Sequence, residues 1–467
     1  MKYLLLLFTW LSCYTSSFGQ TIETDRPNQT NSAKVVPHKS LQLETGLLYE
    51  NFENPYFTNK QNFVNKFCKE KRFALKIVWI NDYCSFKGGA ETYIYETATL
   101  LKKKYDVENI LLYSVENRVD VKFASLFDFA TVIADLKLQL ELIKPDIIYV
   151  HQVSNANLLK ELSLSNFPVI AFIHDHKYFC LREHKYTTLG HKTCTQEIGL
   201  GCYSCLGFLN KEVNFPYLSI KTLSNLKKIH NYYKSFDTVI VASQYMKDHL
   251  ILHNFNEEKI SKIPLFSNQQ NILWESNLKS KPKRFLFVGQ LIRGKGLDTL
   301  LKAFANISDN SCVLDICGDG KQRYEYEVLA VSLGLDERVF FHGKIDKDKL
   351  DTFYDDAYVI VIPSRAPETF NLVGLEAMKH SKAVIASDVG GIKEWLKEKE
   401  NGLLFDSNDT KKLQHQLEYA LSNEDEIIAM GKNAYKIFQE KFIANNHIET
   451  LYNLLETLTQ KELNAVL

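Results

Sequence analysis

Two glutamates stand eight positions apart in the segment PETFNLVGLEA, Pro367 to Ala377. The apolar run YVIVIPS before it predicts a buried strand, and the residues from Leu372 onward predict a helix. The first amides of a helix lack intrahelical partners and bind phosphate groups. Glu368 in the loop can accept hydrogen bonds from sugar hydroxyls, and Glu376 inside the helix can hold a ribose. The positions expected to offer helix-start amides are Phe370, Asn371, Leu372 and Val373.

A second candidate anion site lies in VGQLIRGKGLDTLL, where Arg293 and Lys295 stand between glycines just before a predicted helix. Glycine allows close backbone approach, and the two cations can meet an anion such as a diphosphate. A solvated basic turn has the same composition, so the loop by itself leaves both interpretations open.

These motifs lie in two stretches where short apolar runs alternate with helical patterns. Residues 75–268 and 283–467 each predict a doubly wound α/β domain with a parallel sheet. In two such domains that face each other, the loops at the strand carboxyl ends form opposite walls of one cleft. The helical pattern from Thr410 to Leu467 predicts a tail that packs back across the first domain.

Composition favours small-molecule chemistry. The chain has 467 residues, of which 45% are hydrophobic, enough for at least two cores. Its 56 basic residues balance its 56 acidic residues, so no excess charge favours nucleic acid as a partner. After the first twenty positions no run of 18 apolar residues occurs.

The N-terminal region departs from this pattern. Residues 1–19 have an early lysine, an apolar stretch and a small-residue ending, which resemble a secretory signal peptide. Residues 21–53 resemble the start of a bacterial outer-membrane transporter barrel. We therefore treat residues 20–74 as an atypical segment and linker, and a fused or mis-joined product is one explanation for it.

The motif PETFNLVGLEA, following VGQLIRGKG, resembles the signature of glycosyltransferase family 4, whose fold is called GT-B, over about residues 75–460. This resemblance implies a retaining enzyme that needs no bound metal or other cofactor for catalysis. It also implies that Glu368 contacts the donor sugar, Glu376 the ribose and Lys295 the diphosphate. The family usually has arginine where this chain has Gln290, so Arg293 is the expected substitute.

The first domain offers matching parts. The resemblance implies that Gly88 and Gly89, in GGAE, approach the donor phosphates and the acceptor, although two glycines before a helix also make an ordinary turn. His174, at the end of PVIAFIHD, is implied to lie beside the donor sugar as a catalytic residue with Glu368. A capped strand-end histidine is the alternative. His151 ends another strand and is expected to be structural.

Residues 176–216 form an insert with four cysteines, Cys180, Cys194, Cys202 and Cys205. A C-x-x-C pair with two further cysteines can bind a structural zinc ion or an iron–sulfur cluster. Disulfides, in an exported chain, and four unlinked thiols remain the alternatives.

The predicted function is transfer of a sugar from a nucleotide sugar to a hydroxyl acceptor, a glycan or lipid-linked glycan, in surface polysaccharide biosynthesis. A non-catalytic nucleotide-sugar-binding protein and a sugar-nucleotide epimerase are the alternatives. The basic helix in IKTLSNLKKIHNYYKSF allows peripheral membrane contact. Because nucleotide sugars are cytoplasmic in bacteria, we expect a cytoplasmic location, including the inner membrane face. This expectation conflicts with the signal-like start.

Overall fold

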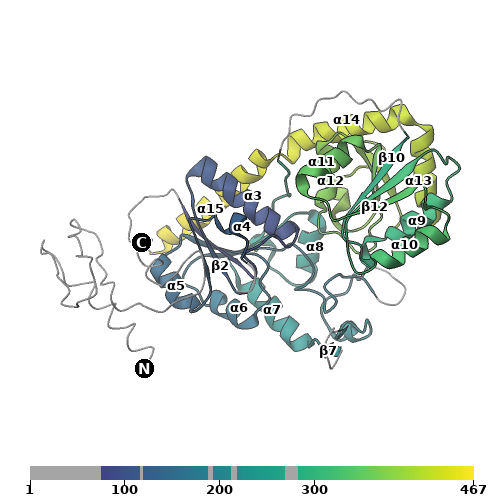
Figure 1. Cartoon of the computed structure of the whole chain (residues 1–467). Coiled ribbons are helices and arrows are strands. Elements are labelled where there is room, and N and C mark those ends of the chain that lie inside the picture. Colours follow the sequence, from purple (N-terminus) through teal and green to yellow (C-terminus); the bar gives the residue numbers. More distant parts are fainter. Residues whose placement is uncertain (1–74, 116–118, 188–192, 212–217, 269–281, 467) are drawn as a thin grey trace, which may run out of the picture.

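The computed structural model describes residues 75–115, 119–187, 193–211, 218–268 and 282–466. These residues form two α/β domains, each built around a parallel sheet (Figure 1). The fold class predicted from the alternating apolar runs is confirmed. The predicted signal peptide and the atypical segment, residues 1–74, lie outside the described residues.

The first domain has a seven-stranded parallel sheet in the order β3-β2-β1-β4-β5-β8-β9. Its strands are β1 (Lys76–Asn81), β2 (Glu108–Tyr113), β3 (Phe129–Val132), β4 (Ile147–Val150), β5 (Val169–Phe172), β8 (Thr238–Val241) and β9 (Ile260–Lys262). Its helices are α3 (Gly89–Tyr105), α4 (Val121–Ala124), α5 (Leu136–Ile143), α6 (Ala156–Ser163), α7 (Leu223–Ser235) and α8 (Gln244–Leu252), with the 3-10 turn η3 (Glu257–Lys259). The central strands are continuous apolar runs because helices cover both faces of the sheet.

The insert between β5 and α7 lies at the lower edge of this domain in Figure 1. Its described part contains the 3-10 turn η2 (Leu200–Tyr203) and a small antiparallel ribbon of β6 (Leu209–Lys211) and β7 (Leu218–Ile220). The ribbon places the Cα atoms of Leu209 and Ile220 opposite each other.

The second domain has a six-stranded parallel sheet in the order β12-β11-β10-β13-β14-β15. Its strands are β10 (Arg284–Val288), β11 (Val313–Cys317), β12 (Val339–Gly343), β13 (Val359–Ile362), β14 (Ala383–Ser387) and β15 (Gly402–Phe405). Its helices are α9 (Leu297–Ala305), α10 (Arg323–Ser332), α11 (Lys347–Asp356), α12 (Leu372–Lys379), α13 (Thr410–Ser422) and α14 (Glu424–Lys441), with the 3-10 turns η5 (Arg293–Lys295) and η6 (Gly390–Glu394). The carboxyl ends of β10 and β13, which are neighbours, carry the predicted donor loops.

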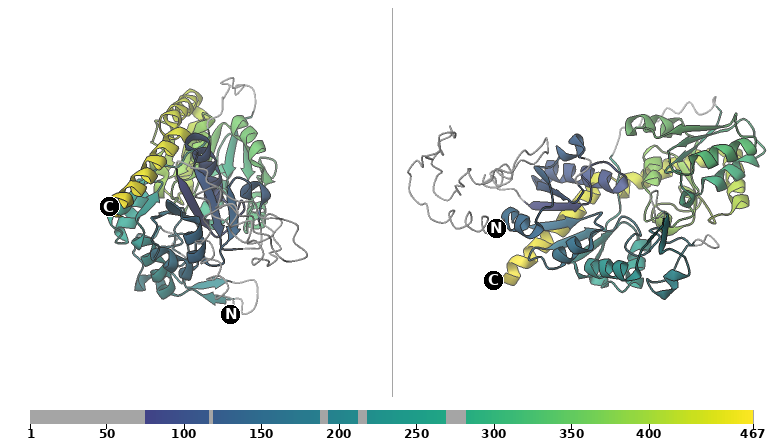
Figure 2. Two further views of the ribbon diagram at one scale, coloured as in Figure 1. Left: turned by 90° about the vertical axis from the view of Figure 1, so that its left-hand side faces the viewer. Right: turned by 60° about the horizontal axis from the view of Figure 1, so that its bottom comes forward.

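The last helix, α15 (Ala444–Val466), leaves the second domain and packs on the first, as the helical tail predicted (Figure 2). Tyr452 of α15 stacks on Tyr105 of α3 with ring centroids 3.7 Å apart. Where the chain crosses between the domains, Ser267 and Ile443 form a parallel bridge. The two crossings therefore lie side by side.

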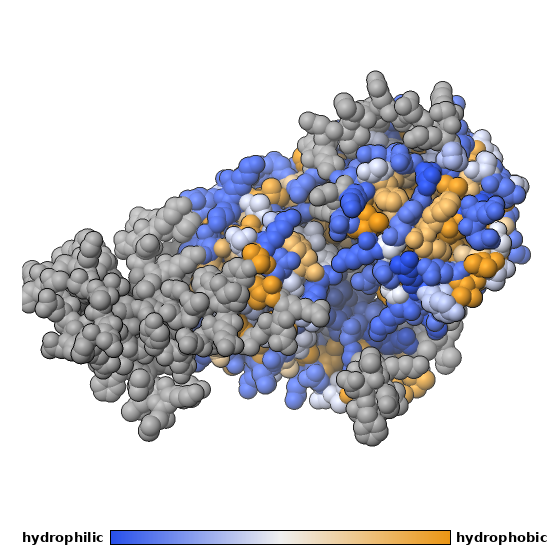
Figure 3. Space-filling model, in the orientation of Figure 1, coloured by the Kyte–Doolittle hydropathy of each residue, from blue (hydrophilic) through white to orange (hydrophobic). Residues whose placement is uncertain are grey.

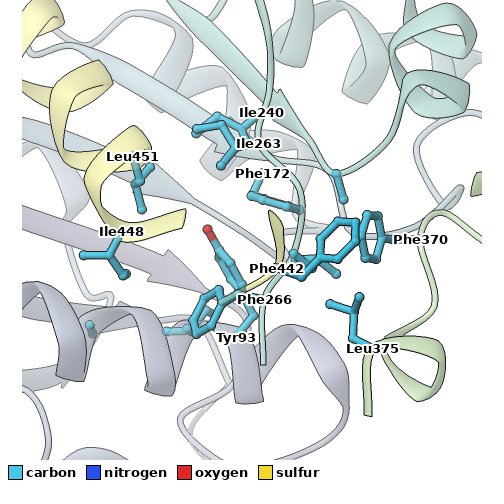
Figure 4. Close-up of a cluster of buried hydrophobic side chains, with 14 of the residues drawn as sticks. Tyr93, Phe172, Ile240, Ile263, Phe266, Phe370, Leu375, Phe442, Ile448 and Leu451 are labelled. Atoms are coloured by element: carbon cyan, nitrogen blue, oxygen red, sulfur yellow. The ribbon is translucent and has the colours of Figure 1, made fainter. Parts of the chain in front are cut away.

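Apolar side chains from both domains share one buried cluster (Figure 4). Phe172 and Phe266 come from the first domain, and Phe370 and Leu375 from the second. The ring of Phe370 lies 5.9 Å from that of Phe442, which stands at the return crossing. Burial of this apolar surface stabilises the contact between the domains.

No helix among the described residues is both long and apolar enough to cross a lipid bilayer.

Candidate active site

The second sheet brings two loops together at its carboxyl edge. Lys295 donates a hydrogen bond from Nζ to Oε1 of Glu368 at 2.8 Å, and the two side chains form an ion pair. They are 73 positions apart in the chain but follow the neighbouring strands β10 and β13. The hydroxyl of Ser364 donates to the same carboxylate oxygen. Two of the predicted site residues thus form one charged unit.

Close packing of the two loops presents Lys295 to the carboxylate. Gly296, the next residue, has a φ of 69°, and a Cβ atom there would lie 1.9 Å from the carbonyl oxygen of Pro363. Only glycine combines this left-handed backbone with such a close approach. The glycine after Lys295 therefore has a defined geometric role.

The charge of Glu368 is set by opposing effects on its pKa. Burial raises this pKa, but the Lys295 charge and its hydrogen bond lower it. Hydrogen bonds from Ser364 and Asn371 lower it further, and the net result is a pKa below the ordinary glutamate value. The carboxylate is therefore ionised at neutral pH although most of it is shielded from solvent.

Helix α12 begins immediately after this carboxylate. Asn371 caps it in an unusual backbone conformation, with a φ of 81°, and its side-chain oxygen accepts a hydrogen bond from the amide of Gly374 at 3.2 Å. Leu372 and Val373 provide the first two helical amides, which have no intrahelical acceptor. These amides and the helix dipole make the N-terminal end of α12 suited to a phosphate group.

Phe370 has a different place from its neighbours. Its side chain is fully buried in the shared apolar cluster, and its carbonyl oxygen accepts a hydrogen bond from Nε1 of Trp395 at 2.7 Å. Any contact of Phe370 with a donor must therefore be made by its backbone.

Glu376 lies half-buried inside α12. Its Oε2 accepts a hydrogen bond from the hydroxyl of Tyr354 in α11 at 2.7 Å. Burial and the neighbouring Glu376 carboxylate both raise the pKa of Tyr354, so this hydroxyl keeps its proton and remains a donor. Tyr354 thus holds one oxygen of Glu376 in place.

Arg293 does not join this group. Its side chain is 70% exposed and lies 3.8 Å from Glu325 on α10, a distance typical of a weak surface ion pair. Gln290 is also exposed. The structure therefore separates the two predicted cations: Lys295 contacts Glu368, whereas Arg293 faces solvent.

The glycine loop of the first domain lies next to the start of α12. Gly88 and Gly89 are exposed, and the Glu91 carboxylate accepts a hydrogen bond from the Gly88 amide at 3.0 Å. A Cβ atom on Gly89 would lie 3.5 Å from Cδ1 of Leu372. Predicted residues from both domains are therefore brought together at this point, and Figure 3 shows hydrophilic surface around the hollow between the domains.

His174 follows β5 and is hydrogen-bonded to His151, at 3.0 Å between Nε2 and Nδ1. Burial, and to a lesser extent the charge of Lys177, lowers the pKa of His174 to about 3. Burial also lowers the pKa of His151, which stacks on Trp79. At neutral pH both imidazoles are uncharged, and His151 orients His174.

No disulfide bond joins the four insert cysteines that the structure describes, Cys180, Cys194, Cys202 and Cys205. They surround Lys185, whose side chain is buried and whose pKa is lowered by that burial, although the four sulfurs act in the opposite direction. Among the described residues, no three His, Cys, Asp or Glu side chains are arranged to hold a metal ion. The structural zinc or iron–sulfur cluster at these four cysteines stays a prediction.

Two residues that contact the predicted glutamates were not predicted. Ser364 contacts Glu368 and directly follows the apolar run of β13, so its place at a strand end was an available signal. Tyr354 contacts Glu376 from another helix, and nothing in its local sequence indicates that contact.

The two halves of the chain match two adjacent family models. Residues 87–267 match glycosyltransferase family 4, and residues 268–437 match glycosyl transferases group 1. An uncharacterized glycosyltransferase of Methanocaldococcus jannaschii is 29% identical over 235 residues, which cover 48% of this chain and 60% of that protein. A D-inositol 3-phosphate glycosyltransferase of Corynebacterium urealyticum is 36% identical over 157 residues, or 32% of this chain and 37% of that protein. The chain thus matches less than two thirds of either relative.

A solved structure extends the likeness to both domains. The crystal structure of HepE from Anabaena in complex with UDP has a TM-score of 0.63 and 17% sequence identity. The match covers 82% of this chain and 100% of that one. At this identity the likeness concerns the fold, and it includes both α/β domains.

Proposed function

Because this chain carries the two domains of a GT-B glycosyltransferase, we propose that it transfers a sugar, with retention of configuration, from a nucleotide sugar to a hydroxyl acceptor. The observation that carries the proposal is the Lys295–Glu368 pair at the start of α12. One ammonium, one buried carboxylate and a set of helix amides together suit a sugar diphosphate.

The leaving group determines which parts of this site accelerate the reaction. Breaking the bond between the anomeric carbon and the phosphate places negative charge on the departing diphosphate. Lys295 and the amides of Leu372 and Val373 stabilise that charge. A preorganised donor of this kind contributes about 3 kcal/mol to the transition state.

Glu368 acts on the sugar rather than on the phosphates. As an ionised carboxylate it accepts hydrogen bonds from sugar hydroxyls and stabilises positive charge that develops at the anomeric carbon. His174 is uncharged and contributes a hydrogen bond on the opposite wall. Neither group forms a covalent bond in this proposal: the acceptor attacks the face that the diphosphate leaves, and a phosphate oxygen accepts its proton.

The proposed donor is a UDP-sugar, since the similar Anabaena protein binds UDP. The proposed acceptor is a glycan or lipid-linked glycan of surface polysaccharide biosynthesis. The proposed place of transfer is the cytoplasmic face of the inner membrane. Exposed apolar side chains on the insert support membrane contact; they are Leu200, Tyr203, Leu206, Leu209 and Ile220. The adjacent helix α7 adds exposed Lys227 and Lys228, which anionic lipid attracts.

Incubation with radiolabelled nucleotide sugars, with and without glycan acceptors, tests the proposal. We expect nucleotide release that requires the matching donor, increases with acceptor and is lost in Glu368→Gln. Binding without release would instead identify a non-catalytic binding protein. Isomerised nucleotide sugar without transfer would identify an epimerase.

A further inference from the structure

The short segment that follows Glu368 is held by residues of both domains. The carbonyl of Glu368 accepts a hydrogen bond from the amide of Gly391 at 2.7 Å, within the second domain. The carbonyl of Thr369 accepts one from the hydroxyl of Ser243 in the first domain at 2.6 Å. The hydroxyl of Thr369 donates to the carbonyl of His174, also in the first domain, at 2.9 Å. Thr369 thus makes two hydrogen bonds across the domain boundary.

These contacts form a closely packed junction. Ser243 is fully buried and caps α8, since its hydroxyl oxygen also accepts a hydrogen bond from the amide of Met246 at 3.2 Å. A Cβ atom on Gly391 would lie 2.5 Å from the Thr369 carbonyl oxygen and 2.8 Å from the Ser243 hydroxyl oxygen. A larger residue would therefore separate the two domains at this point.

A second cross-domain contact lies nearby. Glu394, at the end of η6, forms an ion pair with Lys262 at 2.8 Å and accepts a hydrogen bond from the amide of Gln244 at 2.8 Å. Gln244 directly follows Ser243. Glu394 thus adds one ion pair and one hydrogen bond between the domains beside the contacts of Thr369.

The position of Thr369 relates the two walls of the site directly. Glu368 precedes it in the chain, and His174 supplies the carbonyl that its hydroxyl contacts. The two residues proposed to flank the donor sugar thus come from different domains and are joined through one hydroxyl group. A shift of about 1 Å in such groups is enough to slow a reaction substantially.

We propose that Thr369 is a positioning residue: its hydroxyl aligns the loop that carries Glu368 with the strand end that carries His174 when the domains close around the donor. This role rests on the proposed transfer reaction. The hydroxyl touches neither the donor nor the acceptor, and its contribution comes from the relative placement of the two walls. The net free energy of a neutral hydrogen bond is enough to change the ratio of closed to open molecules severalfold, and it is too small to determine the fold.

The test compares Thr369→Val, which keeps the side-chain shape and the contact of the Thr369 carbonyl with Ser243, with Thr369→Ser, which keeps the hydroxyl. Thr457→Val is the matched control, because the Thr457 hydroxyl also donates to a backbone carbonyl, that of Asn453 at 2.7 Å, at an exposed position of α15. The measurements are kcat, UDP affinity by calorimetry, and the radius of gyration by small-angle X-ray scattering with UDP bound.

For Thr369→Val we expect kcat to fall about five- to tenfold, UDP affinity to change less than twofold, and the radius of gyration with UDP to increase. Thr369→Ser and Thr457→Val should stay within twofold of the unmodified protein. An unchanged kcat and radius in Thr369→Val would overturn the proposal. So would a parallel loss of UDP affinity without a change in radius, since that indicates a direct donor contact.

The scattering result separates this inference from the proposed function. If the unmodified protein turns over no nucleotide sugar but Thr369→Val still opens the domains, the transfer activity is refuted and the alignment of the two walls stands. If the protein is active and Thr369→Val leaves both readouts unchanged, only the alignment is refuted.

Discussion

The two sheets share one architecture but end in different chemistry. In the first domain the strands β4 and β5 lead into His151 and His174, two imidazoles that are uncharged because desolvation lowers their pKa values. In the second domain β10 and β13 lead into Lys295 and Glu368, an ion pair beside a helix start. The charge that each domain presents to the cleft is therefore determined by its loop residues and not by its strands.

This difference suggests a division of tasks. The second domain offers the cation and the helix amides that a diphosphate needs, whereas the first domain offers neutral hydrogen-bonding groups that suit hydroxyls. If the division is correct, removing charge from the second wall should affect the reaction most, and changes in the first domain should act chiefly on alignment or stability.

The largest effect is expected for Glu368→Gln, which keeps the shape but removes the charge. We expect kcat to fall about a hundred- to a thousandfold, with UDP affinity changed only a few-fold, because this carboxylate acts mainly on charge that develops in the transition state. Initial rates and calorimetry measure the two quantities. Glu325→Gln, at an exposed glutamate of α10, is the control. An equal effect of both variants would contradict the assignment of Glu368 to the donor site.

Lys295→Leu is expected to lower kcat/KM about thirty- to a hundredfold and to weaken UDP binding as well. It removes a diphosphate cation and leaves the buried Glu368 carboxylate without its partner. Arg293→Leu, two positions away and exposed, should change either value less than threefold. If Arg293→Leu has the larger effect, Arg293 rather than Lys295 serves the donor.

Glu376→Ala is expected to weaken UDP affinity about tenfold while kcat changes less than twofold. A ribose contact exists in both the ground and the transition state, so its loss reduces binding uniformly. Tyr354→Phe removes the hydroxyl that holds Glu376 and should weaken UDP binding only two- to threefold. Unchanged UDP affinity in both Glu376→Ala and Lys295→Leu would show that the cleft is assigned wrongly.

The smallest effect concerns the pH dependence of stability in the first domain. Burial lowers the pKa of His176 to about 3 and those of His230 and His253 to about 4. In the unfolded chain these histidines protonate near pH 6.5. Their contribution to the free energy of unfolding is therefore fully present above that pH and declines as the pH falls toward 4. Each histidine should cost about 1 kcal/mol of unfolding free energy between pH 7.5 and 5.5.

Urea unfolding across this pH range measures the effect. His230→Phe retains an aromatic ring and should make the decline with falling pH shallower, whatever its effect on absolute stability. His415→Gln, an exposed histidine of α13, should leave the slope unchanged. Equal slopes in all three proteins would show that these buried imidazoles do not differ between the folded and unfolded states.

Much of the fold could be predicted because it depends on local patterns. The apolar runs of β1, β10 and β13 are buried on both faces, so they are continuous and easily recognised. The strands β3 and β9 were not predicted, because each is a short strand at an edge of its sheet and lacks such a run. The apolar pattern of a strand is thus clearest where the strand is buried on both faces.

The sequence was sufficient to predict most of the strands and helices, and to predict Glu368 and Glu376 around a helix start, because those features depend on residues close in the chain. The tertiary structure determines that Lys295 pairs with Glu368 while Arg293 faces solvent, since two cations two positions apart in one loop differ only in the direction of their side chains. It also decided that Thr369 reaches His174 across 195 positions, because that contact requires both sheets and the crossings between them to be in place.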